Sequence, residues 1–173
     1  MHHLHAVYNT VNDSPKSTLH LVIHTVIFLG VLTFCIAMYL GRGRHWEIKL
    51  NTGHKVNPFL IALLPASFLF LVSLQVDLLE INVYEHDKTM LNSNKTKIVE
   101  GIVANFSPES KDGHGYETFT VQGVEFHYAT LEEGRSGYHQ TSWHGGFIKP
   151  NLYVRISYYN DGDRNAILKL ETE

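Results

Sequence analysis

Two long runs without a charged residue constrain this chain more than any other feature of its sequence. Residues 17–41 and 56–76 contain no Asp, Glu, Lys or Arg, although 18% of the whole chain is charged. A helix needs roughly 20 apolar residues to cross the hydrocarbon core of a bilayer, and both runs reach that length. If the first run is helical, apolar residues lie on every face of its helix, which is typical of a lipid-exposed span. We therefore predict a membrane α-helical hairpin with transmembrane helices at 18–41 and 56–77.

The second run also carries a recognisable helix start. Asn57 is a suitable N-cap, and Pro58 suits the first helical position. Pro65 falls inside the run and is expected to kink the helix, which a membrane span tolerates. The alternative is a helical hairpin buried in a soluble core, but two such uncharged helices need more surrounding protein than 173 residues supply.

Basic residues predict the orientation of the hairpin. The connector at 42–55 carries four basic residues, whereas the polar N-terminal tail at 1–17 carries only Lys16. Lys and Arg collect in cytoplasmic loops. We therefore expect a membrane protein whose connector is cytoplasmic and whose N-terminus and C-terminal part are periplasmic or extracellular. Lys88, Lys95 and Lys97 weaken this bias, and the inverted topology stays an alternative.

Alternating apolar residues return after a polar linker at 78–96, and they predict a small all-β domain at 97–173. A long strand begins at Lys97 and has a glycine, Gly101, where it could bend. Two hairpins follow, with tight turns at 122–123 and 161–162. Five strands in this order favour a five-stranded OB-like barrel. An open β-sandwich is the competing fold.

Residues 98–158 resemble a pattern found in uncharacterised bacterial proteins, often membrane-anchored, that carry a small C-terminal β domain. The resemblance covers about a third of the chain, implies a bacterial source and a β domain, and brings no known activity. The two apolar runs are not part of it. The matching residues are Glu100-Gly101-x-Val103-x-Asn105-Phe106-x-Pro108, Gly113-His114, Glu117-x-Phe119-x-Val121-x-Gly123-Val124-x-Phe126-x-Tyr128, His144-Gly145-Gly146-x-Ile148 and Leu152-x-Val154-Arg155-Ile156-x-Tyr158.

The segment 134–150 joins the two hairpins and is the candidate binding site. OB-like barrels place ligand-contacting loops at such connections, and this one mixes aromatic with hydrogen-bonding groups. The alternative is a purely structural loop, in which the glycines supply positive φ. A hydrolase is not expected, because the Gly-x-Ser-x-Gly spacing of a nucleophile elbow is missing. The candidate binding residues are Arg135, Tyr138, His139, Trp143, His144, Gly145 and Gly146.

Twelve histidines suggest a metal site as an alternative. His2 and His3 follow the free amine, an arrangement that suits Cu(II) or Ni(II). The alternative for these residues is an unstructured polar tail. His20 and His24 share one face of the first predicted helix. They could bind a haem together with a helix from a partner chain. The other possibility is that they form a polar pair at the membrane interface and bind no cofactor.

Charge and cysteine content exclude two further classes. Residues 81–173 carry a net charge of −4, which argues against nucleic-acid binding, because that binding depends on Lys and Arg. The single cysteine, Cys35, excludes an intrachain disulfide framework. We therefore expect a non-enzymatic membrane protein without a cofactor that presents an extracytoplasmic β module for protein binding or complex assembly. Its expected partners are other membrane subunits or further copies of the chain, and the alternative is a copper- or haem-handling redox protein.

Overall fold

The computed structural model describes residues 3–12, 17–41, 47–49, 51–112, 115–132 and 134–173. The chain divides into two compact units. A helical unit comprises Lys16–Ile81, and a sheet unit comprises Met1–Pro15 together with Asn82–Glu173. The sheet unit is therefore assembled from the two ends of the sequence.

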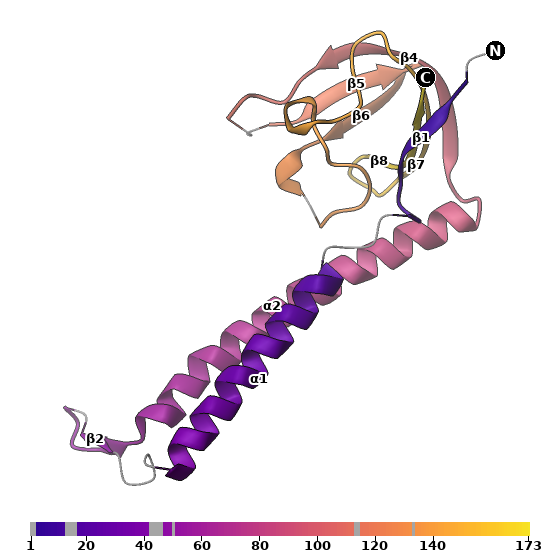
Figure 1. Ribbon diagram of the computed structural model, residues 1–173. Coiled ribbons are helices and arrows are strands. Elements are labelled where there is room, and N and C mark those ends of the chain that lie inside the picture. The colour runs from indigo at the N-terminus through magenta and orange to yellow at the C-terminus, as the bar shows by residue number, and fades with distance from the viewer. Residues whose placement is uncertain (1–2, 13–16, 42–46, 50, 113–114, 133) are drawn as a thin grey trace. The chain divides into compact units, whose positions relative to one another are not determined.

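Two antiparallel helices form the helical unit (Figure 1). Helix α1 spans Ser17–Gly41 and α2 begins at Pro58, while the short strands β2 (Ile48–Lys49) and β3 (Lys55–Val56) pair in the connector. The rings of Phe28 and Phe70 stack between the helices with their centroids 4.3 Å apart. Asn57 caps α2 as predicted, because its side-chain oxygen accepts a hydrogen bond from the Phe59 N–H at 3.0 Å.

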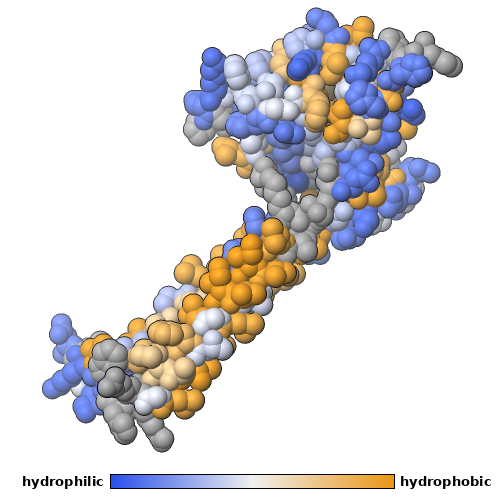
Figure 2. Space-filling model, in the orientation of Figure 1, coloured by the Kyte–Doolittle hydropathy of each residue, from blue (hydrophilic) through white to orange (hydrophobic). Residues whose placement is uncertain are grey.

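On the face shown in Figure 2, most of the surface of the two helices is apolar. Both helices are long and apolar enough to cross a membrane, and only 6% of each apolar window is buried. The core helix of a soluble protein is mostly buried, so the exposed surface here argues against a soluble helical hairpin. Large side chains on both helices contribute to it, including Leu19, Leu40, Leu64, Phe68 and Leu69.

Helix α2 continues to Asn92 and so includes most of the segment predicted as a linker. Its last turns, from Asn82 onward, belong to the sheet unit. Met90 and Leu91 pack there against Tyr159, Ala166 and Leu168. The surrounding residues are polar, and the few apolar positions on one helix face were too sparse to be recognised as an amphipathic pattern.

The sheet unit contains one antiparallel sheet of six strands in the order β1-β8-β7-β4-β5-β6. The two predicted hairpins are confirmed, with Val121 opposite Val124 at one turn and Asn160 opposite Asn165 at the other. Their positions follow from the alternation of apolar residues and the turn residues between them. The strands are β1 (His5–Asn9), β4 (Lys97–Ser107), β5 (Glu117–Val121), β6 (Val124–Tyr128), β7 (Tyr153–Asn160) and β8 (Asn165–Thr172).

The long strand β4 connects two parts of the sheet. Its first six residues, 97–102, pair with β7, and Val103 and Ala104 pair with β5. Gly101 lies just before this change of partner, and a Cβ there would meet the Gln122 side chain at 3.1 Å. The register shift of β4 lies further on, between Ala104 and Ser107, where Asn105 has a φ of +51°. Both parts of the sheet contribute to one core, which includes Val103, Phe119, Phe126, Ile156 and Leu170.

The sheet is open, so the predicted closed OB-like barrel is wrong. Strands β1 and β6 lie at the two ends of the strand order. The outer edge of β8 pairs with β1 along Lys169–Thr172, and this pairing uses backbone groups that a closed barrel would need for its last strand pair. Asn165 of β8 contacts β6 through its side-chain amide, which donates to the Glu125 carbonyl at 2.8 Å.

Strand β1 was not expected, because residues 1–17 were interpreted as a polar tail. Val7 and Tyr8 both pack against the core, although they are neighbours in the sequence. The register shift between Ala6 and Tyr8 makes this arrangement possible, and it removes the alternation by which a strand is recognised in a sequence.

We expect the pairing of β1 with β8 to be detectable by a designed disulfide. Ala6 lies opposite Glu171, and the Cβ atoms of directly opposed residues are about 4.5–5.5 Å apart, which is close enough for a disulfide after small adjustments. In a Cys35→Ser background, the pair Ala6→Cys and Glu171→Cys should therefore cross-link rapidly under mild oxidation. The control pair, Ala6→Cys with Asn165→Cys at the other end of β8, should not. Equal cross-linking of the two pairs would contradict the register.

Candidate binding site in the sheet unit

The connector between β6 and β7 contains two short 3-10 helices, Thr130–Glu132 and Ser142–His144. Gly145 ends the second helix with a φ of +83°, which is the positive φ that its sequence position suggested. Gly146 is required for a different reason. A Cβ at this position would lie 2.1 Å from the Gln140 carbonyl oxygen, so any side chain would displace the loop.

Two buried glutamates lie beneath the second 3-10 helix. Glu117 accepts hydrogen bonds from the Tyr128 hydroxyl at 2.5 Å and from the Ser142 N–H at 2.9 Å. Glu109 accepts one from the Thr141 hydroxyl at 2.8 Å. Burial and the neighbouring Glu117 carboxylate raise the pKa of Tyr128, so this phenol stays protonated and continues to donate.

Sequence reasoning missed both glutamates. Glu117 points to the same face of β5 as the buried Phe119 and Val121, because the three alternate along the strand. This alternation is the signal that could have predicted its burial. Glu109 lies in a loop where no periodicity applies. Acidic residues are almost never fully buried unless they are paired, so exposure was the natural expectation for both.

Trp143 and His144 form the exposed part of the site. Trp143 is 52% exposed, and its indole N–H donates to the Glu109 backbone carbonyl at 2.8 Å. Nδ1 of His144 lies 3.0 Å from the hydroxyls of both Thr130 and Thr141, and 3.9 Å from a Glu109 carboxylate oxygen. These contacts hold both rings while leaving part of each accessible to solvent.

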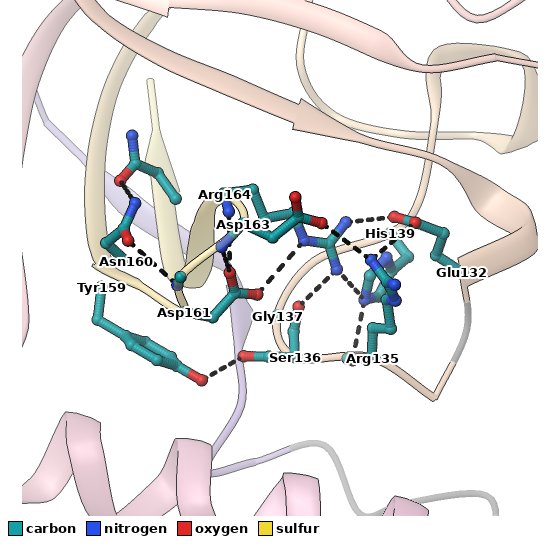
Figure 3. A network of polar contacts seen from close by, with 12 residues as sticks. Glu132, Arg135, Ser136, Gly137, His139, Tyr159, Asn160, Asp161, Asp163 and Arg164 are labelled. Carbon is teal, nitrogen blue, oxygen red and sulfur yellow. Dashed lines mark hydrogen bonds and ion pairs between the residues drawn. The ribbon is translucent and has the colours of Figure 1, made fainter.

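A second polar network surrounds the buried Arg164 (Figure 3). Its guanidinium donates to Glu132 at 2.5 Å and to the Ser136 carbonyl at 3.1 Å. Arg135 also pairs with Glu132, at 3.2 Å. His139 lies in the same network, with Nε2 2.9 Å from the Arg135 carbonyl oxygen. These residues attach the first part of the connector to the β7–β8 hairpin.

The last turns of α2 hold the same part of the connector. The buried Asp87 carboxylate accepts hydrogen bonds from the Ser136 hydroxyl at 2.6 Å, the Tyr159 hydroxyl at 3.0 Å and the Gly137 N–H at 2.9 Å. Gly137 has a φ of +88°, and a Cβ there would meet the backbone of Ile167 at 2.9 Å. The end of α2 and strand β8 therefore fix the connector backbone at Ser136 and Gly137, next to the candidate residues.

The structure divides the seven candidate residues among three environments. Arg135 and His139 belong to the Arg164 network, where they stabilise the connector. Tyr138 is buried in the core, where its ring lies edge-on to Tyr8 and Tyr128. The remaining four, Trp143, His144, Gly145 and Gly146, are consecutive and form the tip of the site.

The histidines of the metal alternative are distributed over both units. His2 lies outside the described residues, and His3 is exposed in the sheet unit. On α1, the rings of His20 and His24 are 6.2 Å apart, and Nδ1 of His24 lies 3.2 Å from an Asp77 carboxylate oxygen on α2. Within the part of the chain that the structure describes, no group of three or more His, Cys, Asp or Glu could hold a metal ion.

Comparison of the chain with protein-family models, with curated protein sequences and with solved structures gives no match.

We expect acid to destabilise the sheet unit through His139. Burial lowers the pKa of this imidazole from its usual 6.5, and Arg164 acts in the same direction, whereas Glu132 and the Arg135 carbonyl oppose the shift. The unfolded chain therefore binds the proton more readily, so this contribution to stability is fully present above pH 6.5 and is lost as the pH falls through the folded pKa.

The measurement is the melting temperature of wild type and of His139→Gln between pH 7.5 and 5, a range of about 2.5 units around the usual imidazole pKa. Gln keeps a donor for the Arg135 carbonyl and does not titrate. The wild type should lose stability relative to the variant below pH 6.5. A difference between the two proteins that does not change with pH would contradict this assignment.

Proposed function

We propose that this chain is a two-span protein of the bacterial inner membrane that holds a β module outside the cytoplasm and binds a partner protein through it. The observation that carries the proposal is the pairing of β1, which precedes both helices, with β8, which follows them. Segments that share a sheet must lie on the same side of a bilayer. A hairpin of two spans satisfies this condition, because an even number of crossings returns the chain to the side on which it started.

The charge distribution supports the proposed orientation. The connector between the two helices carries four basic residues, Arg42, Arg44, Lys49 and Lys55. The first two are outside the described residues. Lys55 pairs with Glu47 at 2.9 Å, but both side chains are well exposed, and acidic residues contribute little to this bias. If the connector between the helices is cytoplasmic, the sheet unit lies on the opposite side of the membrane, outside the cytoplasm. The bacterial source rests on the sequence resemblance alone.

Burial favours binding over catalysis at the tip of the site. The carboxylates of Glu109 and Glu117 are enclosed and engaged with their own chain, so a substrate cannot reach them. Three of the connector side chains that reach the surface are large and apolar. Leu131 is 74% exposed and Phe147 44% exposed, and Trp143 lies in the same connector. Aromatic residues that are exposed on a rigid loop are typical anchors of protein interfaces.

A site-specific photo-cross-linker tests this proposal. In cells, a photoreactive phenylalanine analogue at Trp143 or Phe147 should yield a product of one defined mass, which is either a second copy of the chain or another membrane subunit. The control position is the exposed Gln122, at the other end of the β5–β6 hairpin. This position should give no such product. No product from the two connector positions, or the same products from all three, would contradict binding through the connector.

A further inference from the structure

The exposed face of Trp143 already holds a cation. The Lys111 ammonium lies 4.9 Å from the centroid of the indole ring, within the distance of about 6 Å at which a cation is attracted to the electron-rich face of an aromatic ring. The hydrogen bond from the indole N–H to the Glu109 carbonyl fixes the ring. The face therefore keeps its orientation whether or not the lysine occupies it.

The residue that accepts the indole hydrogen bond, Glu109, also has a buried side chain. The Glu109 side chain is fully buried, and one of its carboxylate oxygens, Oε1, has no hydrogen-bond partner among the described residues. Its other oxygen is bonded to Thr141, and the nearest basic group in the contacts described is the half-exposed His144, at 3.9 Å. Glu109 therefore holds the ring through its backbone carbonyl and Thr141, the N-cap of the second 3-10 helix, through its side chain.

The net charge of the β domain favours cations at this ring. Residues 81–173 carry a net charge of −4, so positively charged groups are drawn to this domain and negatively charged ones are repelled. Lys111 stands on an exposed turn, and its long flexible stem lets its ammonium leave the ring at low cost. These features describe an aromatic cation site that the chain fills with its own side chain.

We propose that Trp143 binds an organic cation, an ammonium or a guanidinium, and that Lys111 occupies the site until such a cation displaces it. The inference rests on the proposed function in one respect, because the cation of interest is a Lys or Arg side chain of the protein partner. A free amine has the same chemistry and is distinguished by the test. No bond is made or broken, since one cation replaces another over the ring.

The fluorescence of Trp143 in the full chain, held in mild detergent, provides the test. The chain has two tryptophans, so Trp46→Phe leaves Trp143 as the single reporter. The probes are Nα-acetyl-lysine amide, a short lysine-containing peptide and Nα-acetyl-norleucine amide, which has a similar side chain without the charge. The two cationic probes should produce a saturable change in fluorescence, and the neutral probe should not.

Substitutions at position 111 test the displacement. Lys111→Met keeps most of the side-chain length, removes the competing charge and should tighten binding of the cationic probes by about two- to fivefold, the factor that corresponds to an exposed cation–π contact. Lys111→Arg keeps a competing cation and should bind about as the wild type does. Lys149→Met removes a positive charge from the β6–β7 connector instead of from the β4–β5 loop that carries Lys111, and this control should also leave the affinity unchanged.

Three results would overturn the inference: an equal response to the neutral probe, no saturable response to any cation, or the same affinity in Lys111→Met as in Lys149→Met. Tighter binding of the peptide than of the amino-acid amide indicates a protein side chain as the ligand, and equal binding indicates a free amine. A cross-linked partner at Phe147 without a cation response rejects only this inference. A cation response without a cross-linked partner rejects only the protein-binding proposal.

Discussion

The pairing of β1 with β8 is the interaction on which the rest of this structure depends. Five residues at the start of the chain complete a sheet whose other strands come from its second half. Thr10 extends the contact, because its N–H and its hydroxyl both donate to the Leu168 carbonyl at 3.0 Å. Val7 and Tyr8 add apolar surface to the core. The chain therefore leaves the sheet after β1, forms the two helices and returns to the same sheet.

Buried polar contacts give the sheet unit a rigid connector. Asp87 and Arg164 each bind Ser136, the first through its hydroxyl and the second through its carbonyl. Burying such charged groups is costly unless they are paired and hydrogen-bonded, and here most of their polar atoms are engaged with neighbouring groups. The stabilisation favours one conformation of the connector, and the exposed Trp143 ring is presented from a fixed position.

The sequence predicted the elements with strong periodicity and missed those held by long-range contacts. The charge-free runs gave both helices, Asn57 gave the start of α2, and the two hairpins lie where the alternation placed them. Strand β1 has no alternation to detect, and without it the sheet was expected to close into a barrel. The connector was recognised from its composition, but Asp87, Glu109 and Arg164 were not, because no local pattern specifies a partner that is distant in the sequence.

The most direct test of the proposed architecture is the accessibility of single cysteines at His5, Thr52 and Glu173 in a Cys35→Ser background. A maleimide that cannot cross the membrane should label positions 5 and 173 in intact cells, whereas position 52 should react only after the membrane is permeabilised. Labelling of position 52 alone would reverse the orientation and keep the hairpin. Labelling of all three positions in intact cells, or of positions 5 and 173 from opposite sides, would contradict a two-span hairpin that returns the chain to complete its own sheet.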